Sequence, residues 1–101
     1  MKITIGNLYE FFRVEKEITL IVSRKPSFLL WKKPSFDSEP LDYISNGDIV
    51  CALEEIKYHS APVSSIGPTQ TLKVLYKGRV GYLCLGQFET FYKCLKEVLY
   101  N

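Results

Sequence analysis

Residues 71–84 read TLKVLYKGRVGYLC, in which two runs rich in β-branched and aromatic residues flank a turn. Lys77 and Gly78 separate the two runs, and a short turn that contains glycine is the usual connection of a two-stranded hairpin. The stretch therefore predicts an antiparallel β-hairpin with arms at 71–76 and 79–84.

Other segments upstream of this hairpin also have the composition of strands. Residues 17–23 (EITLIVS) form a β-branched run bounded by charges, and residues 49–56 (IVCALEEI) follow an Asn-Gly-Asp turn at 46–48. Residues 2–12 are interpreted as a short strand, a turn and a second extended piece. Together with the hairpin these segments indicate a largely antiparallel sheet.

Two loops separate these strands. Residues 24–47 contain three prolines, each of which removes a ladder donor, and only residues 28–31 (FLLW) interrupt this long loop as one arm of a hairpin. Residues 58–70 are rich in Ser, Pro, Gly and Thr and predict a second loop.

The end of the chain carries two signals. Residues 88–92 are good strand material, whereas five apolar residues recur at helical spacing: Phe88, Phe91, Tyr92, Leu95 and Leu99. We expect a short final strand that runs into a helical or frayed tail.

Composition places the chain among ordinary globular domains. It has 101 residues, of which 47% are hydrophobic and 24% are charged, and its net charge is +2. One core is expected at this length, and the net charge is too small to hold nucleic acid or an anionic membrane by itself. No apolar run approaches the ~20 residues that span a bilayer, so we expect a cytoplasmic protein or one carried in a particle assembled in the cytoplasm of a host.

These features predict a mostly β protein with the form of a small antiparallel barrel. We expect five to six strands, a long first loop and, as one of the two readings of the end, a short C-terminal helix. The chain is expected to form a single domain over 1–101, with an N-terminal extension at 1–16, the barrel at 17–95 and a tail at 96–101.

Three pieces of sequence match one family of small barrels. Residues 18–21 (ITLI) match its first strand, 41–50 (LDYISNGDIV) the turn into its second, and 72–83 (LKVLYKGRVGYL) its third and fourth strands. On these residues the stretch from Thr19 to Cys94 resembles the Src-homology-3-like barrels, especially their bacterial relatives. The sequence lacks the acidic and aromatic run and the tandem Trp of the peptide-binding versions, so the resemblance does not imply proline-rich ligands.

The stand-alone size and the leading segment also resemble the small accessory proteins of large tailed bacteriophages. This resemblance implies a component of a larger assembly.

Cations alternate with aromatic side chains in the long first loop. The residues concerned are Arg24, Lys25, Phe28, Trp31, Lys32, Lys33 and Phe36. Loops often carry binding residues, and aromatic rings beside cations stack on bases or hold peptides. The alternative is that Phe28, Leu30 and Trp31 fold inward as a cap on one end of the barrel while the lysines face water.

Two functions of different class follow from these residues. The first is a non-enzymatic protein-interaction module that binds a protein or peptide through Phe28, Trp31, Phe36, Tyr43, Tyr58 and Tyr82. The second is a barrel that binds RNA through Arg24, Lys25, Lys32, Lys33 and Arg79, because 47–50 and 77–82 also look like the RNA-binding ribosomal-type barrels. An exposed aromatic patch is also compatible with self-association.

Catalytic chemistry has little support in the sequence. The cysteines at 51, 84 and 94 are widely spaced and His59 is the single histidine, so we expect reduced, partly buried thiols and no metal site or cofactor. A catalytic cysteine assisted by His59 is the alternative. Glu54 and Glu55 occupy neighbouring strand positions, which point to opposite faces and cannot share a substrate.

Overall fold

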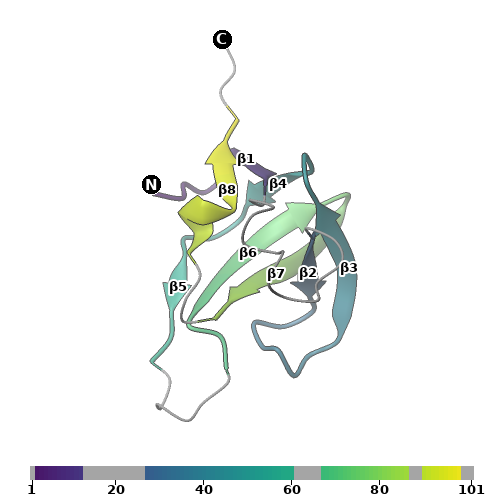
Figure 1. The fold of residues 1–101 in the computed structure, drawn as a ribbon, viewed down its shortest axis with the longest axis vertical. Helices are drawn as coiled ribbons and strands as arrows, with labels where there is room; N and C mark the ends of the chain where they lie inside the picture. Colours follow the sequence, from purple (N-terminus) through teal and green to yellow (C-terminus); the bar gives the residue numbers. More distant parts are fainter. Residues whose placement is uncertain (1, 13–26, 61–66, 87–89, 99–101) are drawn as a thin grey trace, which may run out of the picture.

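The computed structural model describes residues 2–12, 27–60, 67–86 and 90–98, nearly all of which lie in strands and the turns between them (Figure 1). The strands are β1 (Leu8–Phe11), β2 (Ser27–Trp31), β3 (Pro40–Ser45), β4 (Ile49–Ala52), β5 (Lys57–Tyr58), β6 (Gln70–Tyr76), β7 (Arg79–Leu85) and β8 (Leu95–Glu97). A 3-10 turn, η2 (Phe91–Lys93), lies between β7 and β8.

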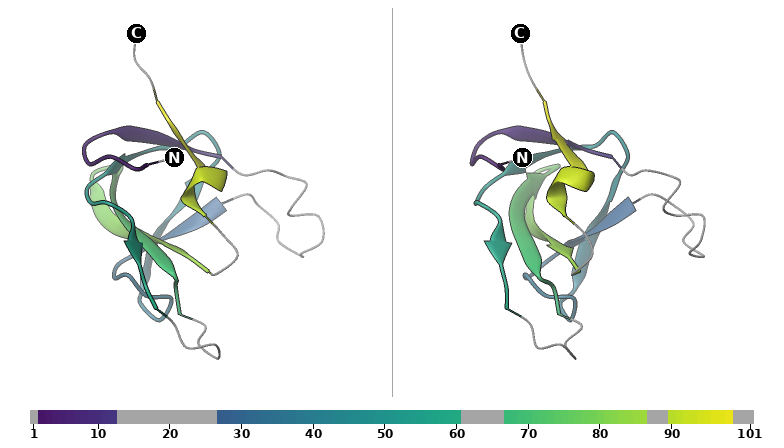
Figure 2. Two further views of the ribbon diagram at one scale, coloured as in Figure 1. Left: turned by 90° about the vertical axis from the view of Figure 1, so that its left-hand side faces the viewer. Right: turned by 60° about the vertical axis from the view of Figure 1, so that its left-hand side comes forward.

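All of these strands join one antiparallel sheet. Its order is β3-β2-β7-β6-β4-β1-β8, and β5 pairs with β6 beyond the end of β4. The sheet curls into a half-barrel around the core (Figure 2). The prediction of a mostly β, antiparallel, barrel-like fold is therefore confirmed, although the described residues contain more strands than the expected five to six.

The hairpin predicted from residues 71–84 is confirmed as β6 and β7. Its register runs from Gln70 opposite Leu85 to Tyr76 opposite Arg79. The connecting residues Lys77 and Gly78 have φ of 48° and 76°. Positive φ at both central residues is the requirement of the type I′ turn, whose twist matches that of the strands it joins.

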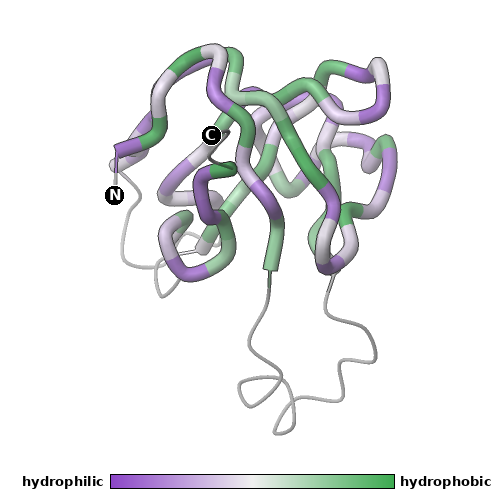
Figure 3. Tube along the Cα trace, turned by 90° about the horizontal axis from the view of Figure 1, so that it is seen from above, coloured by the Kyte–Doolittle hydropathy of each residue, from purple (hydrophilic) through white to green (hydrophobic). Residues whose placement is uncertain are grey.

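The core lies on the inner face of the curled sheet. Along β6, the residues Leu72, Val74 and Tyr76 are buried, while Lys73 and Leu75 between them are not. This period of two is the pattern of a strand with one face on the core, and Figure 3 shows hydrophobic and hydrophilic residues alternating along the trace.

The leading residues belong to this sheet. β1 lies between β4 and β8, and Ile3, Tyr9 and Phe11 are part of the buried core. Residues 2–12, which fall in the expected N-terminal extension at 1–16, are thus a structural part of the barrel. The predicted strand at 17–23 lies outside the described residues.

Two predicted elements differ from the structure in their extent. The strand expected at 49–56 ends at Ala52, and the expected loop at 58–70 is preceded by the short strand β5. At the end of the chain the order of the expected elements is reversed, because the 3-10 turn at Phe91–Lys93 comes before the strand Leu95–Glu97. The strand comes last because residues 95–97 are the ones that pair with β1, from Leu95 opposite Phe11 to Glu97 opposite Tyr9.

Gly81 allows β2 and β7 to approach each other. A Cβ atom at Gly81 would lie 2.6 Å from Cγ of Leu30, a fully buried side chain. Real carbon atoms do not approach so closely, so any larger residue at this position must displace Leu30 or the β2 backbone.

We predict that Gly81→Ala lowers the free energy of unfolding by about 1 to 3 kcal/mol, the usual cost of overpacking a core. Urea denaturation of the two proteins measures the difference. Gly86→Ala is the matched control, because a Cβ at Gly86 meets nothing within 4 Å. Equal losses of stability in both variants would contradict this account of Gly81.

A carboxylate joins two turns at one end of the barrel. Oδ2 of Asp48 accepts a hydrogen bond from the hydroxyl of Tyr76 at 2.5 Å and another from the amide of Ser45 at 2.9 Å. Lys77 lies over the Tyr76 ring, with Nζ 5.1 Å from its centroid. The turn that follows β3 is thus tied to the β6–β7 turn.

These contacts change the pKa values of their partners. The hydrogen bond from Tyr76, and then the one from the Ser45 amide, hold the pKa of Asp48 below its usual value. Burial, and then the Asp48 carboxylate, raise the pKa of Tyr76. The ionised Asp48 and the neutral Tyr76 are therefore the forms that the fold favours.

We predict that Asp48→Asn is less stable than the parent by about 1 to 2 kcal/mol near neutral pH, because a hydrogen bond to a charged group is lost. A lowered folded-state pKa stabilises the fold above the unfolded value, and this contribution is lost as the pH falls through about 4 and below. The stability gap between the two proteins should therefore shrink in acid. Urea midpoints at neutral and acidic pH measure it, and a gap of constant size would contradict the role of the ionised carboxylate.

Candidate functional site

An aromatic pair lies on the outer face of the sheet. Trp31 of β2 is directly opposite Tyr82 of β7, and Tyr82 is directly opposite Lys73 of β6. Directly opposed residues of antiparallel strands place their side chains on the same face. The neighbours of Tyr82 in β7, Gly81 and Leu83, are buried, so Tyr82 and its partners point outward, where Trp31 and Tyr82 are half-buried.

The β2–β3 loop brings a third ring to this pair. Phe36 packs edge-on against Trp31, with ring centroids 5.9 Å apart and planes at 75°. The sequence leaves two alternatives for Trp31, a binding residue or an inward cap. In the structure Trp31 lies on the outer side of the barrel, half-buried, and not in the core.

Tyr43 extends this group onto the neighbouring strand. It is opposite Leu29 in the β2–β3 ladder, and Leu29 lies two residues before Trp31 on the same face of β2. Its side chain is 64% exposed. We call Trp31, Phe36, Tyr43 and Tyr82 the aromatic face.

The two other aromatic residues of the predicted site lie elsewhere. Phe28 packs against the core and makes an edge contact with Phe11, at 5.2 Å between centroids, so it forms part of the inward cap. Tyr58 is on β5, opposite Gln70, and is 75% exposed beside a hollow of about 330 Å³ lined by Lys2, Ile3, Glu55 and Ile56. The structure therefore brings four of the six predicted aromatic residues together.

An apolar row adjoins the aromatic face. Leu8, Cys51, Leu75 and Val80 are successive ladder partners across β1, β4, β6 and β7. This row lies two residues from Lys73 and Tyr82 on the same outer face, and its Leu75 and Val80 are 38% and 50% exposed. Strand alternation alone would have predicted these outward positions, but the pairing that joins them into a row comes from the fold.

Hydrogen bonds within the β2–β3 loop define its shape. The hydroxyl of Ser38 lies 2.8 Å from the carbonyl oxygen of Ser35, to which it donates, and the hydroxyl of Ser35 accepts from the amide of Asp37 at 3.1 Å. The amide of Lys32 donates to the carbonyl of Glu39 at 2.9 Å, which closes the loop at its base. The loop surrounds a hollow of about 370 Å³ lined by Lys32, Lys33, Ser35, Asp37, Ser38 and Glu39.

The predicted basic residues are only partly gathered by the fold. Lys32 and Lys33 are exposed beside Trp31, but Asp37 and Glu39 line the same hollow. Arg79 donates from Nη1 to the carbonyl of Leu41 at 3.0 Å and thereby links the two hairpins. The other two predicted basic residues, Arg24 and Lys25, lie outside the described residues.

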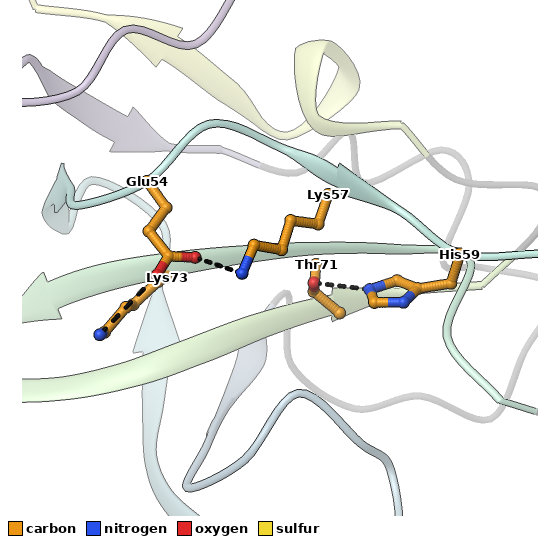
Figure 4. Close-up of polar contacts among 5 residues, drawn as sticks. All are labelled: Glu54, Lys57, His59, Thr71 and Lys73. Atoms are coloured by element: carbon orange, nitrogen blue, oxygen red, sulfur yellow. Dashed lines mark hydrogen bonds and ion pairs between the residues drawn. The ribbon is translucent and has the colours of Figure 1, made fainter.

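A polar cluster follows the outer face of β6 towards β5 (Figure 4). Glu54 lies between two lysines, 3.1 Å from Nζ of Lys57 and 3.9 Å from Nζ of Lys73. Lys73 was not among the predicted site residues. The two-residue turn at 77–78 sets the register that puts it directly opposite Tyr82. Partly exposed ion pairs of this kind stabilise a fold only slightly.

His59 makes a structural contact in the same cluster. Its Nε2 lies 2.8 Å from Oγ1 of Thr71, a buried residue directly opposite Cys84 in the β6–β7 ladder. Burial raises the pKa of the Cys84 thiol to about 12. A thiol in this state is protonated at neutral pH and is a poor nucleophile, so the geometry does not favour a Cys84–His59 pair.

We predict that Cys84 reacts with iodoacetamide at least roughly tenfold more slowly than the half-buried Cys51 in the folded protein, because its thiolate is disfavoured and covered. Mass spectrometry of the labelled peptides over time measures both rates. Labelling in denaturant serves as the control, since the cysteines should then react alike. Preferential labelling of Cys84 in the folded state would indicate an activated thiol and contradict this reading.

Comparisons with known proteins do not assign the chain to a family. No family model, curated protein or solved structure matches it. Across the described ranges, no three His, Cys, Asp or Glu residues are grouped so as to hold a metal ion. The same ranges contain no helix long and apolar enough to cross a membrane. The function is therefore inferred from the geometry of the outer face.

Proposed function

We propose that the chain is a non-enzymatic protein-interaction module that binds a partner polypeptide through the aromatic face, as a component of a larger bacterial or bacteriophage assembly. The observation that carries this proposal is the outward pairing of Trp31 with Tyr82, with Phe36 against the Trp31 edge. These rings have no role in the inner core. Aromatic side chains held in this way are the usual anchors of protein interfaces.

The surroundings of the aromatic face support a polypeptide partner. The apolar row of Leu8, Cys51, Leu75 and Val80 continues the surface on one side. Lys73 and the β2–β3 loop supply polar groups at its border. An apolar centre with a polar rim is the general anatomy of a protein interface.

The strand order supports the resemblance to Src-homology-3-like barrels. β4, β6 and β7 form a meander, β1 and β8 pair beside β4, and a 3-10 turn precedes β8. In this scheme β1 at Leu8–Phe11 has the place of the first strand, which the sequence match had given to 18–21. The long first loop then includes the β2–β3 hairpin, with Trp31 on its first strand and Phe36 in its loop.

Trp31→Ala should reduce capture of the partner from a lysate of source cells by on the order of tenfold, in line with the loss of an interface anchor. Tyr82→Ala should act in the same direction, and capture should persist at high salt. Tyr58→Ala is the control, because it removes an exposed ring that lies away from the aromatic face.

Circular dichroism and urea midpoints establish that each variant is folded before capture is compared. Undiminished capture by both Trp31→Ala and Tyr82→Ala would refute the proposal.

A second candidate function is RNA binding, which the exposed Lys32 and Lys33 beside Trp31 favour. Asp37 and Glu39 in the same hollow weaken this candidate, because they repel phosphate groups. Binding through lysines must weaken steeply with salt as counterions are released. Retention of RNA only at low salt, and its loss in a Lys32→Ala, Lys33→Ala double variant, would favour this second function over the first.

A further inference from the structure

The sequence contains one Asn-Gly pair, Asn46–Gly47, in the turn between β3 and β4. An asparagine followed by glycine loses its side-chain amide most readily, because glycine has no side chain to hinder attack by its backbone nitrogen. Both residues are exposed, and a Cβ placed on Gly47 would meet nothing within 4 Å. Water therefore reaches this turn, and burial does not prevent the reaction.

The backbone holds the pair in a defined turn. The amide of Asp48 donates to the carbonyl of Ser45 at 3.0 Å, so Asn46 and Gly47 are the two central residues. Gly47, the second of them, has a φ of 87°. Positive φ at this position is the requirement of a type II turn. The fold therefore needs glycine at the position that also favours loss of the Asn46 amide.

The same turn is bound to the end of β1. The amide of Gly47 donates to the carbonyl of Phe11 at 2.9 Å, and the amide of Phe11 donates to the carbonyl of Asp48 at 2.7 Å. Gly47 and Asp48 thus oppose Phe11 together, which is the pattern of a β-bulge whose first residue is a left-handed glycine. The Phe11 side chain is buried, so the core holds this end of β1 in place.

Deamidation uses the nitrogen that this bulge occupies. The backbone nitrogen of Gly47 attacks Cγ of Asn46 and gives up its proton, and the side-chain amide leaves as ammonia from the five-membered succinimide that results. Water then opens the ring to aspartate or to isoaspartate, in which the chain continues through the former side chain. The net change is the gain of one water and the loss of one ammonia. While the N–H of Gly47 is bonded to Phe11, its nitrogen is held away from this reaction.

We propose that Asn46 is a deamidation site that reacts when the end of β1 separates from the turn at Phe11. The closed bulge protects the Gly47 amide, and each opening exposes it to the Asn46 side chain. Native proteins undergo local openings of this kind without unfolding globally. Deamidation thereby converts a transient opening of β1 into a lasting covalent change, and it does so whatever partner the aromatic face binds.

The modified turn cannot keep its contacts. Isoaspartate lengthens the backbone before Gly47 by one carbon atom, so Gly47 and Asp48 no longer oppose Phe11 in register. Aspartate at position 46 instead adds a negative charge two residues from the Asp48 carboxylate, which accepts a hydrogen bond from the Ser45 amide. Both products weaken the attachment of β1, and the isoaspartyl product weakens it more.

Amide hydrogen exchange in the parent protein tests the closed state. The amides of Gly47 and Phe11 should both be protected, with similar protection factors, because one opening breaks both hydrogen bonds. Exchange of the Gly47 amide at the rate of exposed backbone would show that its nitrogen is not protected and would overturn the proposal.

The rate of deamidation tests the protection itself. The full chain and the peptide acetyl-Tyr-Ile-Ser-Asn-Gly-Asp-Ile-Val-amide, which copies residues 43–50, are incubated at neutral pH, and mass spectrometry follows conversion at position 46. The folded chain should react at least roughly tenfold more slowly than the peptide. Asn46→Gln needs a larger ring and should show no conversion, which identifies the site. Equal rates in the chain and the peptide would contradict protection by the bulge.

A pair of variants locates the opening. Phe11→Leu loosens the packing at the end of β1 but keeps its backbone hydrogen bonds, and should speed deamidation by roughly tenfold. Gly81→Ala is the matched control, because it perturbs the distant seam between β2 and β7 and should have little effect. Urea midpoints establish that both variants are folded, and the exchange measurement on the parent protein depends on neither. Absence of acceleration in Phe11→Leu, or equal acceleration in both variants, would overturn the proposal.

Discussion

The close approach of β2 to β7 at Gly81 is the contact on which the outer surface of this protein depends. β7 is shared by two hairpins, since β6 pairs along one edge and β2 along the other. The missing side chain at Gly81 leaves room for Leu30 to fill the core at this seam. Because Leu30 points inward there, its neighbour Trp31 must point outward beside Tyr82. One glycine thus couples the packing of the core to the position of the rings outside it.

The β6–β7 hairpin could be predicted because its signals are local. The turn residues Lys77 and Gly78 and the alternation on both sides specify the strands and their register without reference to the rest of the chain. The role of β1 could not be predicted in the same way. Its four residues, LYEF, resemble many short extended pieces, and they become a strand because β4 and β8 pair on both sides.

The candidate site shows the same division between local and distant information. Aromatic excess pointed to Trp31, Phe36, Tyr43 and Tyr82, and the structure places these four on one face. Composition could not separate them from Phe28, which packs inward against Phe11. The face of the sheet on which a side chain lies depends on how its strand pairs with its neighbours. The adjacency of Trp31 and Tyr82 also arises from a non-local ladder, and no local pattern in the sequence records it.

The β3 end of the sheet bears on how copies of this domain meet one another. The amide of Tyr43 donates to Oδ1 of Asp42 at 2.8 Å, and the amide of Ser45 donates to Oδ2 of Asp48 at 2.9 Å. An end strand whose amides are already occupied by side chains offers fewer donors to the strand of a neighbouring molecule. Two aspartates therefore protect this edge against edge-to-edge aggregation.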